Sequence, residues 1–476
     1  MVFSSVVFLF FFLPITLVGY YLINPKFRNY WLLFVSLVFF AWSQLNYLWI
    51  ILLNIAINYS AAMLMEHTHE KARKPIVILA IIANLAILFY FKYFDFMIDS
   101  INKLFHCSLE FRNIILPIGI SFFTFQGMSY TIDVYRKEVA AQKNPLKVAL
   151  YITLFPQLIA GPIVRYTDIA QEIDARRVNV SEFSSGIERF IIGLGKKAII
   201  ANTMAACVDG IWKSGAANNT WITLLLGSIA YSLQIYYDFS GYSDMAIGLG
   251  RMFGFHFNEN FDLPYISKNI SEFWRRWHIS LGSWFRDYVY IPLGGNKKHV
   301  YLNLAIVFLL TGLWHGASWH FVLWGIYNGF FVLAERWLSH REKQKSDKDK
   351  HPFADFLRHV YALVVINIGW IIFRAPSTRE GIVYFLTMIG LKQPVRVDFT
   401  PFWFFDRWTI TIMIIGIVFS FALHKKIFAV LSNRFSDGVG SKVLTISKYV
   451  VLIALLYLSM IRITSGTYNP FIYFQF

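Results

Sequence analysis

Two tryptophan–histidine pairs, Trp277-His278 and Trp314-His315, are the residues of this sequence best suited to chemistry. Both histidines lie in long apolar or aromatic stretches, where an ionisable side chain is costly and therefore rare. Imidazole exchanges a proton close to neutral pH, so either residue could act as a general acid or base. The alternatives are a buried His315 that bonds a backbone carbonyl, and a His278 on the polar edge of an interfacial helix. Two such pairs favour an enzyme over an inert anchor.

Other catalytic signatures are absent from the sequence. The run Gly241–Met245 lacks the final glycine of a serine nucleophile elbow, and there is no HExxH motif, phosphate-binding loop or GxGxxG. None of the twelve histidines is followed five residues later by aspartate. Cys107 and Cys207 form no CxxC pair, so no metal is expected. His320 follows His315 by five residues and would point away from it on one helix, so we expect a structural role.

The composition is that of a membrane protein. The chain has 476 residues, 57% of them hydrophobic, and its mean hydropathy is positive. Largely uncharged runs are near the roughly 20 residues that cross a bilayer, and we expect about 11 spans. The first run lacks a basic start and a cleavage site, so we expect a retained span. These runs are residues 3–23, 30–59, 76–94, 148–164, 221–237, 301–314, 408–423 and 443–461.

The net charge of +16 is explained by the membrane rather than by nucleic acid, because the basic residues cluster in short loops. The short link at Ser43–Asn46 carries no basic residue. The positive-inside rule then predicts that both termini lie outside. The hydrophilic stretch Ser339–His351 should be a cytoplasmic loop, and apolar spans on both sides of it indicate one domain over residues 1–476. The clusters expected in the cytoplasm are Lys26/Arg28, Lys71/Arg73/Lys74, Arg136/Lys137/Lys143/Lys147, Lys297/Lys298, Arg341–Lys350 and Lys425/Lys426.

Two stretches differ from ordinary spans. In Phe155–Arg165, Pro156 and the Gly161-Pro162 pair should break a helix. Residues 271–295 should form an interfacial or re-entrant amphipathic helix that Ser271 caps and that ends at Pro292 and Gly294-Gly295.

Asp238 and Asp244 lie in an apolar setting. We expect them to pair with Arg251, Arg275 or Arg276 and so to hold helices together, or else to line a polar tunnel. A direct catalytic role is the weaker interpretation.

Several motifs together resemble the membrane-bound O-acyltransferases, and within them the bacterial alginate O-acetyltransferase branch. The resemblance covers most of the chain. Its motifs are LPIGISFFTFQ at 116–126, FPQLIAGP at 155–162, YDFSGYSDMAIGLG at 237–250, FWRRWHIS at 273–280, YIPLGGN at 290–296, GLWHG at 312–316 and PFIYFQF at 470–476.

The resemblance implies an all-α polytopic membrane protein, in which helices surround a thin central layer with re-entrant helices. It also implies that His315 is the family's essential histidine and that His278 is the second functional histidine. The two would meet where a cytoplasmic and an outer cavity approach each other.

The function implied is transfer of an acetyl group from cytoplasmic acetyl-CoA, through the membrane, to an extracytoplasmic polysaccharide. A separate Ser-His-Asp partner would make the final transfer. Four basic residues, Arg275, Arg276, Lys297 and Lys298, could attract the phosphates of coenzyme A, or could be positive-inside anchors. His315 would be the general base, and His278 would bind the acyl carbonyl or the attacking oxygen.

Other functions remain open at this stage. A teichoic-acid D-alanyl transferase would share the fold and take its acyl group from a carrier-protein thioester. Peptidoglycan or cellulose acetylation are further variants. A transporter should show internal repeats or paired broken helices in both halves, and the sequence shows neither.

Overall fold

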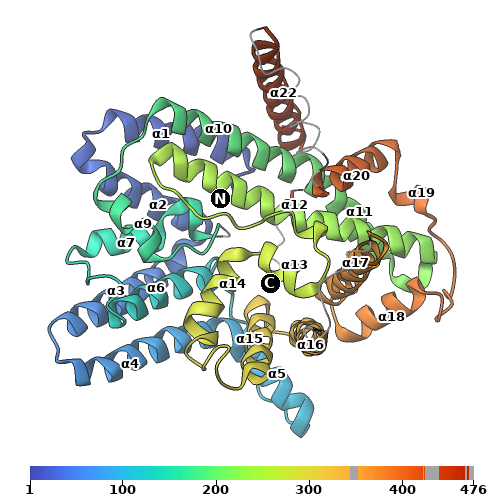
Figure 1. The fold of residues 1–476 in the computed structure, drawn as a ribbon, viewed down its shortest axis with the longest axis horizontal. Helices are drawn as coiled ribbons and strands as arrows, with labels where there is room; N and C mark the ends of the chain where they lie inside the picture. Colours follow the sequence, from blue (N-terminus) through green and yellow to red (C-terminus); the bar gives the residue numbers. More distant parts are fainter. Residues whose placement is uncertain (160, 343–351, 422, 424–438, 467–468, 471–476) are drawn as a thin grey trace. The chain divides into compact units, whose positions relative to one another are not determined.

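The computed structural model describes residues 1–159, 161–342, 352–421, 423, 439–466 and 469–470 (Figure 1). The described residues form helices, and their only β pairings are two isolated bridges, so the predicted all-α class is confirmed. The chain groups into two compact units, which we describe separately. Unit 1 is Met1–Phe190 with Tyr242–Glu259, and unit 2 is Ile191–Gly241 with Asn260–Phe476.

The predicted hydrophilic loop at 339–351 is partly helical, because the helix before it extends to Glu342. Its remaining residues, 343–351, lie outside the described part of the chain, as do Lys425, Lys426 and the tail 471–476.

Unit 1 is a bundle of helices from the N-terminal half. Its main helices are α1 Leu13–Leu22, α2 Arg28–Gln44, α3 Leu48–Glu66, α4 Glu70–Leu88, α5 Phe94–Phe105, α6 Ile120–Tyr135, α7 Pro145–Thr153, α8 Phe155–Leu158 and α9 Tyr166–Asp174. The predicted link at Ser43–Asn46 is confirmed, since α2 ends at Gln44 and a short 3-10 turn, Leu45–Tyr47, precedes α3. The predicted break at Pro156 is also confirmed, because α8 has only four residues.

A buried polar network holds α3, α4 and α6 together, and Figure 1 shows these helices side by side. Asn54 and Asn58 of α3 donate to Asn84 Oδ1 of α4 at 2.6 and 3.0 Å. Thr131 of α6 donates to Asn58 Oδ1 at 2.7 Å. Hydrogen bonds between otherwise apolar helices fix their register where the hydrophobic effect cannot.

Unit 2 carries both tryptophan–histidine pairs. Two long helices, α10 Val180–Gly195 and α12 Trp221–Phe253, each contain a boundary between the units. The other helices used below are α11 Asn202–Ser214, α13 Ile270–Arg276, α14 Ile279–Phe285, α15 Val300–His315, α16 Trp319–Glu342, α17 Pro352–Arg374, α18 Thr378–Met388, α19 Pro401–Phe404, α20 Arg407–Ser420 and α22 Val439–Thr464.

Helices α15 and α16 form a tight antiparallel pair because small residues line their contact. A Cβ atom at Gly312 would lie 2.5 Å from the Phe321 carbonyl oxygen, and one at Gly325 would lie 2.5 Å from that of Phe308. Such backbone approach is typical of helix pairs in membranes. It sets the position of His315, the last residue of α15.

Membrane crossing is supported by both length and composition. Five helical stretches are long and apolar enough to span a bilayer: Pro25–Glu66, Glu70–Phe105, Val180–Ser214, Pro352–Arg374 and Gly440–Thr464. Three shorter apolar helices are Phe8–Leu22, Val300–His315 and Arg407–Ser420. Much of α22 is exposed, with Val450 58% and Ile453 67% accessible, as expected of a surface that lipid covers. The protein is therefore a multi-pass membrane protein.

Candidate active site

His278 lies at a break between two short helices. The predicted single helix from Ser271 is wrong in two respects. The helix α13 begins at Ile270, where the Asn269 side chain accepts the Glu272 N–H, and it ends at Arg276. His278 then adopts a left-handed conformation, with φ of 46°, before α14 begins. This conformation is uncommon for a residue with a side chain, so the surroundings must hold it.

The break is held by pairing with an extended segment, residues 260–262. Phe261 and Trp277 form an antiparallel bridge. The Asp262 N–H donates to the Arg276 carbonyl at 2.9 Å, and the Ile279 N–H donates to the Asn260 carbonyl at 3.0 Å. The aromatic periodicity of residues 271–295 continues through the break, so the sequence contains no local sign of it.

The Asn260 side chain lies directly beside His278. Its Oδ1 atom is 3.1 Å from His278 Nδ1, and it accepts the Ser280 N–H at 3.2 Å and the Ser280 hydroxyl at 2.9 Å. Asn260 is 1% exposed and His278 is 3% exposed. The sequence pattern gives no sign that Asn260 belongs to the site, because its contact with His278 spans 18 residues and belongs to no local motif.

The imidazole of His278 is otherwise enclosed by aromatic rings. Its centroid lies 4.5 Å from that of Phe239 and 5.9 Å from that of Trp314. Among the described residues, no hydrogen-bond partner reaches its Nε2 atom, which is fully buried. A buried polar atom without a partner is costly, and such atoms often mark functional sites.

His315 is enclosed by aromatic rings of three helices. Its ring centroid lies 5.0 Å from Trp314, 5.0 Å from Trp324 and 5.1 Å from Phe373, each at a steep angle. Trp314 therefore contacts both imidazoles, and the structure brings the two predicted histidines together. His320 belongs to α16 and not to the helix of His315, so the geometry assumed for it was wrong; its Nδ1 lies 2.9 Å from Ser318 Oγ.

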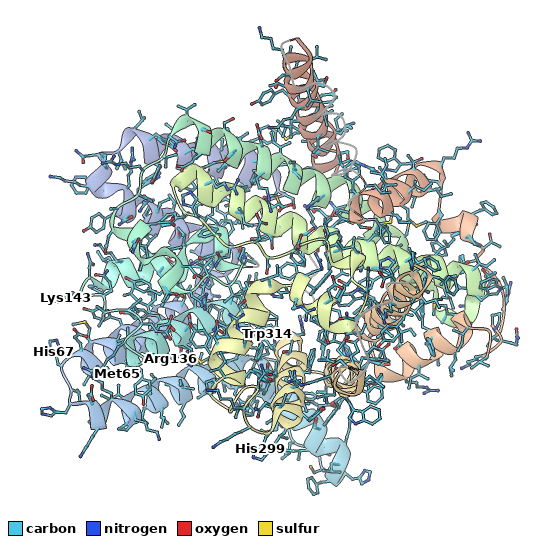
Figure 2. All side chains as sticks on the ribbon, in the orientation of Figure 1. Met65, His67, Arg136, Lys143, His299 and Trp314 are labelled. Carbon is cyan, nitrogen blue, oxygen red and sulfur yellow. The ribbon has the colours of Figure 1, made fainter. Side chains whose placement is uncertain are left out.

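The four predicted donor-binding residues lie in different settings. Arg276 pairs with Asp262 at 2.8 Å and with Glu272 at 3.0 Å, whereas Arg275 is exposed. Lys297 and Lys298 are exposed in the turn that precedes α15. They lie beside His299, at the opposite end of α15 from Trp314 (Figure 2). Fifteen residues of helix correspond to about 22 Å, so the two lysines do not touch the histidines.

The two buried aspartates hold helices together, as predicted, but with different partners. Asp238 of α12 lies 2.5 Å from Lys197 Nζ, and both side chains are almost wholly buried. Asp244 lies 2.6 Å from Arg189 of α10. The partners expected from the sequence were Arg251, Arg275 and Arg276, and this expectation was wrong, since the structure pairs the two aspartates with Lys197 and Arg189.

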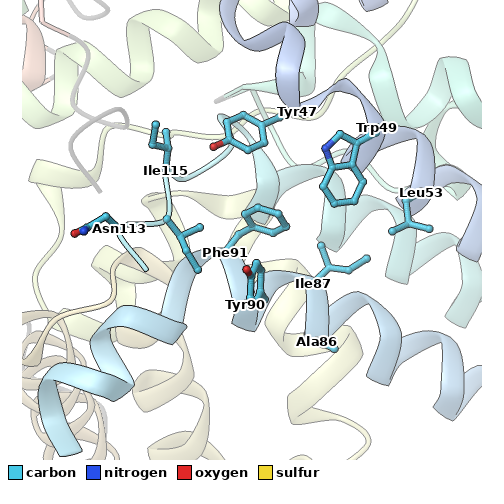
Figure 3. Close-up of a pocket in the computed structure, with 10 residues that line it drawn as sticks. Tyr47, Trp49, Leu53, Ala86, Ile87, Tyr90, Phe91, Asn113 and Ile115 are labelled. Atoms are coloured by element: carbon cyan, nitrogen blue, oxygen red, sulfur yellow. The ribbon is translucent and has the colours of Figure 1, made fainter. Parts of the chain in front are cut away.

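Two cavities in the described part of the chain lie away from the histidines. One, of about 730 Å³ in unit 1, is lined mainly by aromatic and aliphatic side chains such as Trp49, Tyr90 and Ile115 (Figure 3). The other, of about 460 Å³ in unit 2, is lined by residues that include Asn202 and Arg462. Both histidines are buried.

The chain belongs to the MBOAT, or membrane-bound O-acyltransferase, family, whose model matches residues 86–374, more than half of the sequence. It is therefore an acyltransferase. Both tryptophan–histidine pairs lie inside the matched region.

Several similar proteins are named as O-acetylases or O-acetyltransferases. The chain is 35% identical to a probable alginate O-acetylase AlgI of Azotobacter vinelandii, over 100% of both chains. It is 42% identical to the corresponding protein of Pseudomonas aeruginosa, over 80% of this chain and 73% of that protein. It is also 36% identical to a peptidoglycan O-acetyltransferase of Helicobacter pylori, over 82% and 80% of the two chains.

Proposed function

We propose that this enzyme takes an acetyl group from acetyl-CoA on the cytoplasmic face of a bacterial inner membrane and delivers it for O-acetylation of an extracytoplasmic polysaccharide. The observation that carries the proposal is the shared contact of His278 and His315 with Trp314 in a buried site of unit 2. Two imidazoles that are packed around one indole form a preorganised site for proton transfer.

In the proposed reaction, His315 is the general base. A hydroxyl oxygen attacks the thioester carbonyl carbon, and its proton passes to His315. The new C–O bond forms as the C–S bond breaks, and the coenzyme A thiolate takes the proton back from His315 and leaves as the thiol. General base catalysis of this kind contributes roughly 10²–10⁴-fold in rate. His278 binds either the acyl carbonyl or the acceptor.

The proposed donor site uses the exposed Lys297 and Lys298, with Arg275 as a further cation. Their positive charge would attract the phosphates of coenzyme A. Arg276 is the weakest of the four candidates, because its guanidinium already pairs with two carboxylates.

The direction of transfer rests on the placement of basic clusters in unit 1. Lys137 pairs with Glu70, which brings two of the clusters together. Lys147 pairs with Asp174 at 2.5 Å, and the Asn29 side chain donates to the Ile173 carbonyl at 2.8 Å. Both partners are at the end of α9, so the basic cluster that includes Arg28 lies near the one that includes Lys147. The labelled residues His67, Arg136 and Lys143 lie on the same side of the unit (Figure 2). These contacts support one common basic face of unit 1, which we assign to the cytoplasm. We further propose that both termini lie outside.

The proposed acceptor comes from the relatives, and the proposed partner comes from the family resemblance. The relatives named alginate O-acetylases favour an alginate-like polysaccharide as the final acceptor, and the Helicobacter pylori relative makes peptidoglycan the second candidate. A partner with a Ser-His-Asp site outside the membrane would complete the transfer. We further propose about 11 spans, arranged as one membrane domain.

The donor can be tested with purified protein in detergent. Wild-type protein should release free thiol from acetyl-CoA and transfer labelled acetyl to an acceptor. The Lys297→Gln/Lys298→Gln double variant should raise the apparent KM for acetyl-CoA roughly three- to tenfold with kcat unchanged, because each exposed charge contributes at most about 1 kcal/mol. Lys392→Gln, another exposed lysine, is the matched control.

If only a carrier-protein thioester serves as donor, the acetyl-CoA assignment is wrong and D-alanyl-type transfer replaces it. An unchanged KM in the double variant would remove the two lysines from the donor site.

A further inference from the structure

The hydrogen bonds of Asn260 determine which nitrogen of His278 carries a proton. A backbone N–H can only donate, so the Asn260 atom that contacts the Ser280 N–H at 3.2 Å must be the amide oxygen. The same oxygen is 3.1 Å from His278 Nδ1. An amide oxygen only accepts hydrogen bonds, so Nδ1 must be the protonated nitrogen.

The Nδ1-protonated imidazole has its lone pair on Nε2. This atom is buried, and no described residue donates a hydrogen bond to it. Neutral His278 can therefore accept a hydrogen bond from a substrate through Nε2, but it cannot donate one. It cannot polarise the acyl carbonyl, which needs a donor.

We infer that Asn260 is a positioning residue, which holds His278 in the Nδ1-protonated tautomer so that Nε2 accepts a hydrogen bond from a hydroxyl group of the acceptor. The inference deepens the proposed function and rests on it. It excludes one of the roles that were open for His278, binding of the acyl carbonyl. An acceptor that carries two neighbouring hydroxyl groups can bond His278 through one of them while the other attacks and gives its proton to His315.

The local backbone supports this role. The Ile279 N–H bonds the Asn260 carbonyl at 3.0 Å, and the Asp262 N–H bonds the Arg276 carbonyl at 2.9 Å, so the backbones on both sides of the break are joined. The left-handed φ of His278, 46°, is maintained within this pairing. Asn260 thus fixes the orientation of the ring as well as its protonated nitrogen.

The test combines spectroscopy with activity. Full-length protein labelled with ¹⁵N-histidine is studied by NMR in detergent, and the His278 signal is identified by its loss in His278→Gln. The wild-type ring should be protonated at Nδ1. Asn260→Leu should lose this preference and slow acetyl transfer about 10²-fold or more. Asn260→Asp keeps an acceptor oxygen, so it should keep the tautomer and most of the activity.

Asn328→Leu is the matched control. Asn328 is also a buried asparagine of unit 2, and within the described residues its side chain donates to the Trp324 carbonyl of its own helix, at 2.9 Å. This variant should change neither the tautomer nor the rate.

Protonation of His278 at Nε2 in the wild type would overturn the inference, and that measurement needs no variant to fold. An Asn260→Leu protein with an unchanged tautomer or an unchanged rate would also overturn it. A wrong proposed function would be distinguished from a wrong inference, because the wild type would then show the Nδ1 tautomer without acetyl transfer.

Discussion

At the scale of single residues, the two histidines are held by different forces. His278 is fixed through a hydrogen bond at 3.1 Å to Asn260, which determines its tautomer. His315 is held by three aromatic rings with centroids 5.0–5.1 Å away, which fix the plane of its ring by packing. One imidazole is therefore oriented as an acceptor, whereas the other lies in an aromatic enclosure suited to a general base. Trp314 connects them, because its indole ring contacts both imidazoles.

At the scale of secondary-structure elements, the α15–α16 pair positions His315. The close approach at Gly312 leaves no room for a side chain, since a Cβ atom would meet a backbone oxygen at 2.5 Å. Backbone atoms cannot move aside as a flexible side chain can, so the helices would have to separate. Displacement of α15 would move His315 away from Trp324 on α16.

We predict that Gly312→Ala destabilises the protein by about 1–3 kcal/mol, the usual cost of overpacking, and lowers acetyl transfer. Gly282→Ala is the control, because its Cβ would meet no atom closer than 3.9 Å in the described structure. The thermal unfolding midpoint in detergent and the transfer rate are measured for both. Equal midpoints for the two variants would show that the helix contact does not constrain the site.

The elements also show which features a sequence can predict. The uncharged link at Ser43–Asn46 and the break at Pro156 follow from local rules, and both are confirmed. The two histidine motifs can also be recognised in the sequence, because ionisable residues are rare in apolar runs. The break at His278 could not be predicted, since a distant segment holds it by hydrogen bonds.

The ion-pair partners of the buried aspartates could not be predicted from the sequence either. Asp238 pairs with Lys197, 41 residues away, across two helices. Composition predicts that such an aspartate needs a cation. Only the packing of α12 decides which of many basic residues supplies it.

At the scale of the whole molecule, the proposed direction of acetyl transfer requires a defined orientation of the protein in the membrane. In unit 1, the basic clusters share one face, and the uncharged link lies at the other end of α2, where Gln44 accepts the Ile118 N–H at 2.8 Å. The positive-inside rule assigns the basic face to the cytoplasm. If the basic face is cytoplasmic, as proposed, the loop after α5 that carries the exposed Cys107 lies outside.

In cells with a permeable outer layer, a membrane-impermeant maleimide should therefore label the wild-type protein. The labelled residue should be Cys107, because Cys207 is buried. Cys107→Ser should abolish the labelling. Thr68→Cys in the Cys107→Ser background should react only after the inner membrane is opened, since residue 68 lies beside the basic cluster at 71–74. Labelling of the Thr68→Cys variant from outside would reverse the orientation and the proposed direction of transfer.

The measurement that tests the central claim most directly is acetyl transfer from labelled acetyl-CoA by purified wild-type and His315→Ala proteins. The thermal unfolding midpoint and the elution volume in size-exclusion chromatography should be the same for both proteins, which shows that the variant is folded. We predict that the wild type transfers acetyl and that His315→Ala loses at least about 10²-fold in rate. A folded His315→Ala protein that transfers acetyl at a rate close to that of the wild type would contradict the assignment of the active site.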